Sequence, residues 1–147
     1  MTSALRRVLS GEADQMKHVV VLGAGMVGGA MAADLCHDFA VTVVDANRAR
    51  GAALTDRYPL AFRPADLAHP TAVSQAVADA DLVIGAVPGF LGYQTLAAVI
   101  AAGKNVVDIS FFPEDPFALD DLARQNGVTA VVDCGVAPGL GNLILGY

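Results

Sequence analysis

Three glycines in the stretch GAGMVGGAM have the spacing G-x-G-x-x-G, which is typical of loops that bind the pyrophosphate of a dinucleotide. In such a loop Gly23 permits a tight turn, Gly25 lets the backbone approach the phosphates, and Gly28 lets a helix lie close to a strand. The backbone N–H groups near Met26 and Val27 begin the helix that follows, so we expect them to face the phosphates.

An acidic residue supports this interpretation. Asp45 ends the second apolar stretch, about 20 residues after the glycines, where a carboxylate is expected to hold the ribose hydroxyls. A carboxylate accepts hydrogen bonds from a 2′-hydroxyl and repels a 2′-phosphate, which favours NAD. Arg48 could instead pair with a 2′-phosphate, so NADP remains an alternative, although a solvated position on a helix is the simpler interpretation of Arg48.

Residues after later strands are expected to contact the rest of the cofactor, because ligands of such sheets lie outside the carboxyl ends of the strands. Asp66 and Leu67 follow the third expected strand and are predicted to lie near the adenine. Ala86, Val87 and Pro88 follow the fourth and are predicted to lie beside the path to the nicotinamide.

Groups for catalysis are few. Asp108 and Asp133 lie near the ends of the fifth and sixth expected strands, and each is either a substrate ligand or a structural acid. His18 begins the first expected strand, Lys17 precedes it and Lys104 precedes the fifth, so all three lie at the opposite edge of the sheet from the cofactor. With no basic residue placed to hold a substrate carboxylate, the catalytic residues remain unknown and Asp108 and Asp133 are weak candidates.

The two cysteines, Cys36 and Cys134, are far apart and form no CxxC motif. This pattern favours reduced cysteines of a cytoplasmic protein over a disulfide or a metal site, and we expect no bound metal.

Apolar strands alternate with helices of about ten residues, which predicts an α/β fold. The architecture expected is a Rossmann-type doubly wound parallel sheet of about six strands in a three-layer α/β/α arrangement. The strands are expected at 18–23, 40–45, 60–64, 81–87, 105–110 and 129–134. The helices are expected near 26–37, 47–58, 70–79, 90–102 and 116–126, and Asn142 is expected to cap a further helix.

Composition limits the classes of partner. A net charge of −6 argues against a nucleic-acid-binding protein. Residues 82–103 carry no charge and are long enough to span a bilayer, but Pro88 and Gly89 interrupt them, so we expect no membrane span. The hydrophobic fraction of 54% suits a sheet buried on both faces and a further face that packs on a partner. Self-association through an exposed apolar face is therefore expected.

The stretches AVPGFLG, DISFF and DCGVAPG are more specific than the glycine loop. With the loop itself, they resemble the N-terminal part of the saccharopine dehydrogenase-like oxidoreductases over residues 16–147, and the lysine 6-dehydrogenase-like members most closely. The resemblance implies NAD(P)-linked oxidation of an amino-acid amine, through an imine that water opens. It also implies a second α+β domain after this point, which completes the substrate pocket and forms a dimer.

The domain organisation expected is a leader at 1–16 and a truncated NAD(P)-binding Rossmann domain at 17–147, without the second domain. An amino-acid substrate is expected to bind only together with that domain, so we expect the chain alone to be inactive. Two alternatives stay open. In the first, the chain is a stand-alone NAD-binding regulatory module, and in the second it is an inactive remnant of a truncated gene.

Overall fold

A parallel sheet of six strands, in the order β3-β2-β1-β4-β5-β6, organises the computed structural model, which describes residues 16–146. The strands are β1 (His18–Leu22), β2 (Ala40–Asp45), β3 (Ala61–Pro64), β4 (Leu82–Gly85), β5 (Val106–Asp108) and β6 (Ala130–Val131). The helices are α2 (Met26–Leu35), α3 (Arg48–Thr55), α4 (Pro70–Ala76), α5 (Gly89–Ala101), α6 (Asp120–Asn126) and α7 (Leu140–Leu145), with a 3₁₀ helix η1 (Pro116–Leu119). This is the α/β fold with a doubly wound sheet that the sequence predicts.

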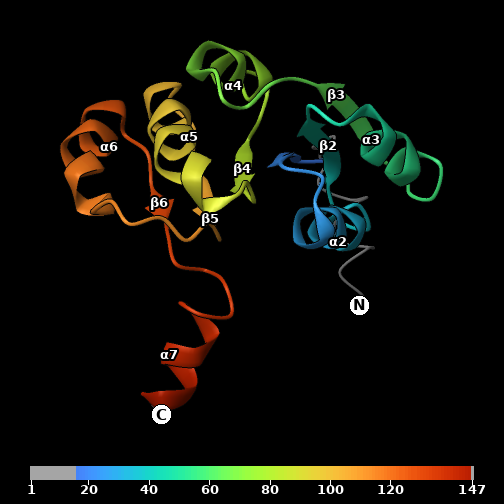
Figure 1. Ribbon diagram of the computed structural model, residues 1–147. Coiled ribbons are helices and arrows are strands. Elements are labelled where there is room, and N and C mark those ends of the chain that lie inside the picture. Colours follow the sequence, from blue (N-terminus) through green and yellow to red (C-terminus); the bar gives the residue numbers. More distant parts are fainter. Residues whose placement is uncertain (1–15, 147) are drawn as a thin grey trace, which may run out of the picture.

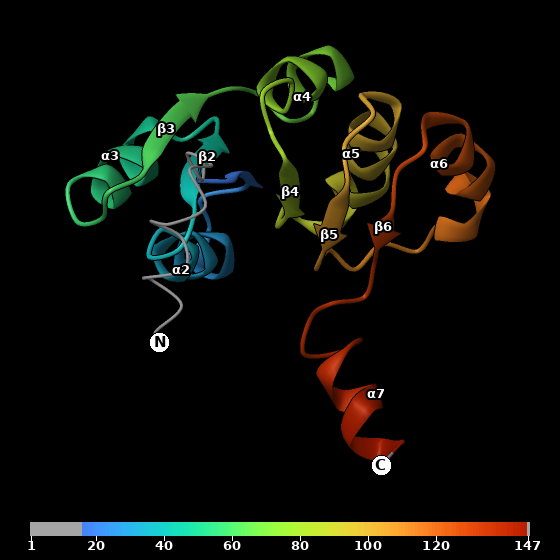
Figure 2. The ribbon, with the colours of Figure 1, turned by 180° about the vertical axis from the view of Figure 1, so that it is seen from behind.

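The buried side chains explain why the central strands are so apolar. Val19 and Val21 of β1 face one side of the sheet and pack with α2 and α3, whereas Val20 and Leu22 face the other side and pack with α4 and α5. Figures 1 and 2 show α4, α5 and α6 along one side of the sheet, with α2 on the other. A strand covered on both faces needs apolar side chains at consecutive positions.

Strands β1 and β4 are neighbours at the centre of the sheet, and the order of the strands changes direction between them. Strands β1, β2 and β3 spread to one side and β4, β5 and β6 to the other, so β1 and β4 are neighbours with Leu22 opposite Gly85. In such sheets the ligand binds at this switch point, outside the carboxyl ends of the strands, which we call the carboxyl edge. We call the opposite end the amino edge.

Several expected boundaries differ from those observed. Strand β6 covers Ala130–Val131 instead of 129–134, because it pairs with β5 at only two positions and the chain turns at Asp133, whose φ is 58°. The helix expected at 116–126 begins as η1, where the Asp115 side chain accepts a hydrogen bond from the amide of Phe117, and continues as α6. Except for Met16, the expected leader lies outside the described residues.

The expectation that Asn142 caps the last helix is wrong. Helix α7 begins earlier, at Leu140, directly after Gly139 with a φ of 126°, and Asn142 lies inside it. Figures 1 and 2 show α7 projecting away from the sheet. Leu143, Ile144 and Leu145 are consequently 67–88% exposed.

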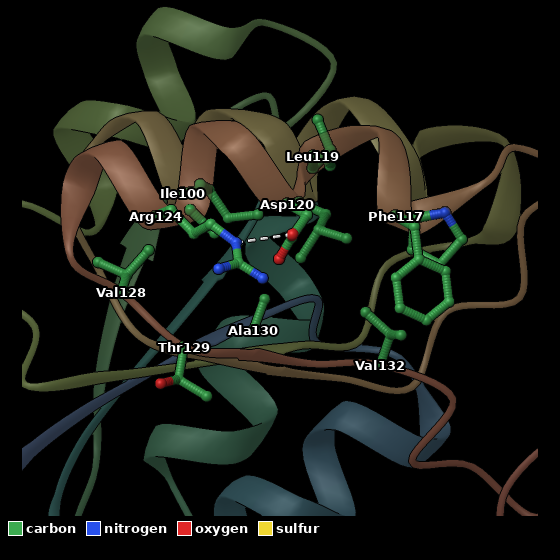
Figure 3. A pocket seen from close by; sticks show the side chains of 12 residues that line it. Ile100, Phe117, Leu119, Asp120, Arg124, Val128, Thr129, Ala130 and Val132 are labelled. Carbon is green, nitrogen blue, oxygen red and sulfur yellow. Dashed lines mark hydrogen bonds and ion pairs between the residues drawn. The ribbon is translucent and has the colours of Figure 1, made fainter.

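A cavity of about 270 Å³ lies between α5, η1, α6 and β6 (Figure 3). Its lining is mostly apolar, including Leu96, Ile100 and Val132, and an ion pair of 2.8 Å between Arg124 and Asp120 of α6 lies on its wall. No residue of the glycine loop lines this cavity, and neither does Asp45. The cavity is therefore separate from the dinucleotide site that the sequence predicts.

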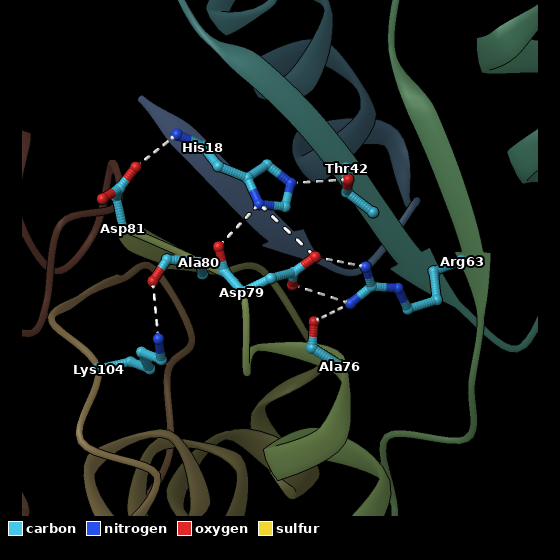
Figure 4. Close-up of polar contacts among 8 residues, drawn as sticks. All are labelled: His18, Thr42, Arg63, Ala76, Asp79, Ala80, Asp81 and Lys104. Carbon is cyan, nitrogen blue, oxygen red and sulfur yellow. Dashed lines mark hydrogen bonds and ion pairs between the residues drawn. The ribbon is translucent and has the colours of Figure 1, made fainter. Parts of the chain in front are cut away.

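Polar side chains tie the strands together at the amino edge (Figure 4). One ring nitrogen of His18 lies 3.0 Å from the backbone carbonyl oxygen of Asp79, and the other lies 2.9 Å from the hydroxyl of Thr42. The Arg63 guanidinium donates two hydrogen bonds, of 3.2 and 2.9 Å, to the Asp79 carboxylate. These hydrogen bonds hold the pKa of Asp79 below its ordinary value and raise that of Arg63.

Two more contacts complete this amino-edge network. The His18 amide donates to the Asp81 carboxylate at 2.8 Å, and the Lys104 ammonium donates to the carbonyl of Ala80 at 3.0 Å. His18 and Lys104 thus lie where the sequence places them, away from the cofactor edge, and their polar groups make structural contacts.

No helix among residues 16–146 is both long and apolar enough to cross a membrane. In the same range, no three His, Cys, Asp or Glu side chains gather as metal ligands. Cys36 is buried and Cys134 is exposed, and both are free thiols.

Candidate functional site

The glycine loop begins where β1 ends. Gly23 has a φ of 111°, which favours glycine, and its amide donates to the carbonyl of Val44 at 2.8 Å. A Cβ at this position would lie 2.5 Å from the carbonyl oxygen of Ala86. Gly23 therefore permits both the turn and the close approach of the segment after β4.

Gly28 and Gly25 differ in what surrounds them. A Cβ on Gly28 would lie 2.1 Å from the carbonyl oxygen of Gly23, so helix α2 can pack this closely on the loop only without a side chain there. A Cβ on Gly25 would meet nothing within 4 Å, and the φ of Gly25, −69°, suits any residue. The fold itself therefore does not require glycine at position 25, and the free space there fits a ligand that approaches the backbone.

The free space at Gly25 lies at the N-terminus of α2. Gly25 is the N-cap residue, no side chain caps the helix, and its first turn holds no acidic residue. The first backbone N–H groups of a helix have no partner within the helix, and the helix dipole makes this end attractive to anions. Met26 and Val27, at the same end, are 96% and 56% exposed. The arrangement fits a pyrophosphate.

Asp45 faces this loop from the end of β2. One carboxylate oxygen accepts a hydrogen bond of 2.7 Å from the amide of Ala24, and the other accepts one of 2.7 Å from the amide of Asn47. These contacts fix the direction of the carboxylate and leave each oxygen a further lone pair for a hydroxyl group. Asn47 caps α3 through a hydrogen bond from the amide of Arg50.

The basic residues near Asp45 lie on α3. Arg48 is its first residue and is exposed, and no ion pair holds Arg48 within the described part of the chain. Arg50 lines a hollow beside Gly25, between α2 and α3, together with Arg57. Arg50 was not expected at this site from the sequence. Its position two residues after Arg48 could have indicated a second basic side chain near the cofactor.

The two residues expected near the adenine, Asp66 and Leu67, differ in exposure to solvent. Asp66 is exposed, accepts a hydrogen bond of 3.0 Å from the amide of Ala68, and lies 3.6 Å from the ring of His69. Leu67 is only 7% exposed and packs in the core, so its side chain offers little surface to a ligand. The sequence pattern did not reveal this inward direction.

The segment after β4 connects to the segment after β5. Pro88 is exposed and caps α5, Ala86 is half-buried, and Val87 is buried. The Ser110 hydroxyl donates a hydrogen bond of 3.1 Å to the carbonyl of Val87. This contact fixes the segment that is expected to lie beside the nicotinamide.

Asp108 is buried, with 1% of its surface exposed. One carboxylate oxygen accepts a hydrogen bond of 2.6 Å from the amide of Ser110, and the other has no partner in the described part of the chain. This second oxygen occupies the space left by Gly85, where a Cβ would lie 1.8 Å from it. Burial, and to a lesser degree the charge of Asp133, raises the pKa of Asp108 to about 6.

Asp133 lies at the surface beside this buried acid. It is exposed and has the left-handed backbone conformation, with a φ of 58°. The amide of the next residue, Cys134, donates a hydrogen bond of 3.1 Å to the carbonyl of Asp108. The structure therefore brings the two candidate acids together at the carboxyl edge, one buried and one open to solvent.

Large apolar side chains are exposed near the same edge. Met26 begins α2, Phe90 lies in the first turn of α5, and Phe111 follows β5, with exposed fractions of 96%, 82% and 72%. Their exposure was not expected from the sequence, because exposure of one apolar residue cannot be recognised from its neighbours along the chain.

Comparison with known proteins agrees with the geometry of the loop. The family model described as the saccharopine dehydrogenase NADP-binding domain matches residues 19–131. The chain belongs to this family. It is thus a nicotinamide-dinucleotide-binding domain of the saccharopine dehydrogenase-like oxidoreductases.

Solved structures of oxidoreductases have the same fold. Saccharopine dehydrogenase (L-Glu forming) from Saccharomyces cerevisiae, in its apo form, is 25% identical, with a TM-score of 0.79 over 88% of this chain and 29% of that chain. The WlbA dehydrogenase from Chromobacterium violaceum, solved with NADH, is 19% identical, with a TM-score of 0.65 over 82% of this chain and 35% of that chain.

A short-chain dehydrogenase/reductase from Veillonella parvula, solved with NADP, is 22% identical, with a TM-score of 0.52 over 63% of this chain and 46% of that chain. The chain therefore spans less than half the length of each of these three proteins.

Proposed function

We propose that this chain is the dinucleotide-binding part of an oxidoreductase that oxidises an amino-acid amine by hydride transfer to the nicotinamide. The observation that carries the cofactor half of this proposal is the free space at Gly25, at an uncapped helix N-terminus and beside the fixed carboxylate of Asp45. The amine half is supported by the family resemblance and by the saccharopine dehydrogenase from yeast among the similar structures.

Each part of the site would have a distinct task. The amides at the start of α2 would bind the pyrophosphate, Asp45 would hold the ribose hydroxyls, and the exposed Asp66 would lie near the adenine. Ser110 would hold the segment of Val87 and Pro88 beside the nicotinamide through its hydrogen bond to the Val87 carbonyl. The bound cofactor would supply the hydride acceptor.

The cofactor we propose is NAD, with NADP as the alternative. The fixed carboxylate of Asp45 favours a 2′-hydroxyl, whereas the name of the family and the exposed Arg48 and Arg50 favour a 2′-phosphate.

Replacing Asp45 by alanine decides between the two cofactors. We expect Asp45→Ala to weaken NAD binding by about 1.5–3 kcal/mol, because charge-assisted hydrogen bonds to the ribose are lost. NADP binding should improve, since the repulsion of its phosphate disappears. Isothermal titration calorimetry with both cofactors measures the ratio, and Asp56→Ala, an exposed position at the end of α3, is the matched control. An unchanged ratio would place Asp45 outside the site.

A second candidate function is cofactor binding without catalysis, in a regulatory module or an inactive remnant. It is favoured by the burial of Asp108 and by the absence of Lys, Arg and His from 86–103, 105–123 and 125–147. Lysine-dependent production of NADH by the chain of residues 1–147 would exclude this second candidate. Turnover would support the enzyme, and binding without turnover would support the module or a need for further domains.

The protein partner we propose is a second copy of this chain, which associates through an exposed apolar face. Leu143, Ile144 and Leu145 are exposed on α7, which projects from the sheet. We expect concentration-dependent oligomers in light scattering, because large exposed apolar patches drive association. Replacing the three residues by serine should reduce the average mass, while replacing exposed Thr55 by serine should not. A monomer at all concentrations in the unmodified chain would refute the proposal.

A further inference from the structure

The carboxyl edge is divided by charge. On the side of β2 and β3, the acids Asp45 and Asp66 have basic neighbours, which are Arg48, Arg50 and His69. On the side of β4, β5 and β6, the charged residues at or after the ends of the strands are all acids. These are Asp108, Glu114, Asp115 and Asp133, and the sequence between 86 and 147 contains no basic residue other than Lys104 and Arg124.

Neither of these two basic residues offsets the charge at the edge. Lys104 precedes β5 and donates to the carbonyl of Ala80 in the amino-edge network. Arg124 lies on α6 and pairs with Asp120 at 2.8 Å. The formal side-chain charge on the β4–β6 half of the carboxyl edge is therefore negative.

Asp108 is the acid best placed to act at a distance. It ends β5 directly beside Gly85, the last residue of β4, and one of its carboxylate oxygens has no partner in the described part of the chain. A charge in a buried position is screened less than a charge in water, so its effect on a neighbouring charge is larger. Asp133 adds a second negative charge close enough to raise the pKa of Asp108.

A bound dinucleotide would bring to this half of the edge a charge that depends on its redox state. If the pyrophosphate binds at α2 and the adenosine beside Asp45, as proposed, the nicotinamide would lie on the other side of the switch point, toward β4 and β5. The oxidised nicotinamide ring carries one positive charge, and the reduced ring is neutral. A negative potential therefore stabilises the oxidised ring and has little effect on the reduced ring.

We propose that Asp108 and Asp133 make the site select the oxidised cofactor over the reduced one. This inference rests on the proposed function, since it assumes that the dinucleotide binds as described. Both residues would act on the nicotinamide through their charge. Asp108 is buried, so its charge would act through the interior of the domain.

The preference should depend on pH. Of the elements packed around Asp108, β4 contributes no titratable side chain and α5 contributes only Tyr93, whereas the segment after β6 contributes Asp133 and Cys134. The segment after β5 adds Glu114 and Asp115, both exposed. Because the pKa of Asp108 is raised to about 6, this residue gains its charge as the pH rises through that value. The preference for the oxidised cofactor should therefore increase over the same interval.

The test is the ratio of the dissociation constants of NADH and NAD⁺ for the chain of residues 1–147, measured by calorimetry at about pH 5.5 and pH 8. We expect the ratio to rise several-fold with pH in the unmodified chain and to stay nearly constant in Asp108→Asn. Asp133→Asn, an exposed change with little risk to folding, should lower the ratio several-fold at pH 8. The matched control is Asp38→Asn, which removes an exposed acid after α2.

The outcomes are distinguishable. A ratio that is unchanged in both variants, with normal binding of NAD⁺ and NADH, would overturn this inference and leave the proposed function intact. Failure of the unmodified chain to bind either cofactor would overturn both. An equal shift in Asp38→Asn would show that the effect comes from net charge and would also overturn the assignment to Asp108 and Asp133.

Discussion

Replacing Gly25 by valine is expected to abolish dinucleotide binding and to lower the thermal unfolding temperature by only a few degrees. A Cβ at this position meets nothing within 4 Å, and the backbone conformation there is accessible to any residue. The cost to the fold is limited to a poorer N-cap, about 1 kcal/mol. The branched side chain, however, would fill the space where the pyrophosphate approaches the amides of α2.

The matched variant is Gly28→Val, one turn further along the same helix. Here the new Cβ would lie 2.1 Å from the carbonyl oxygen of Gly23, and neither backbone can move freely. We expect the unfolding temperature to fall sharply, with a loss of several kcal/mol or no folded protein. Circular dichroism measures stability and calorimetry measures binding for both variants. Equal affinity for NAD in Gly25→Val and the unmodified chain would refute the assignment of the loop.

The second large effect concerns stability and pH. The pKa of Asp108 is about 6 in the folded chain, whereas an exposed aspartate has an ordinary pKa of 3.8. Below both values the carboxyl group is neutral in the folded and the unfolded chain and costs nothing. As pH rises, the unfolded chain ionises first, so the folded state loses stability until Asp108 is also ionised. At neutral pH the penalty is on the order of 2–3 kcal/mol.

We therefore expect Asp108→Asn to stabilise the domain at about pH 7.5 and to stabilise it much less at about pH 4.5. The asparagine keeps an oxygen that can accept the hydrogen bond from the Ser110 amide. Urea denaturation at the two pH values measures the difference, with Asp133→Asn as a smaller change of the same sign, because it removes the charge that adds to the shift. Equal destabilisation at both pH values would contradict the prediction.

The fold was predictable from the sequence because its signals are local. Val19, Val20 and Val21 are consecutive and apolar, as a strand covered on both faces requires. The capping side chain of Asn47 and the left-handed glycines Gly103 and Gly127 lie where the sequence indicates the start or end of a helix. The parallel direction of the strands follows from the alternation of strands and helices.

The details of the site were less predictable because they depend on neighbours that are distant in sequence. The burial of Asp108 requires the space left by Gly85 on an adjacent strand, and no pattern around Asp108 indicates it. The inward direction of Leu67 likewise depends on the packing of the core. Strand β6 is short because its length is set by pairing with β5 alone, and the apolar run at 129–134 overstates it.

The amino-edge network has a consequence for how such a domain can evolve. The contacts of His18, Asp79 and Arg63 link strands β1, β2 and β3 at the amino edge, the end of the sheet opposite the proposed cofactor site. Exposed positions at the other end, such as Met26, Arg48 and Pro88, can therefore be exchanged without loosening these ties. A mutant library confined to those three positions should retain a high proportion of folded members, which makes the domain a suitable starting point for changing cofactor choice by selection.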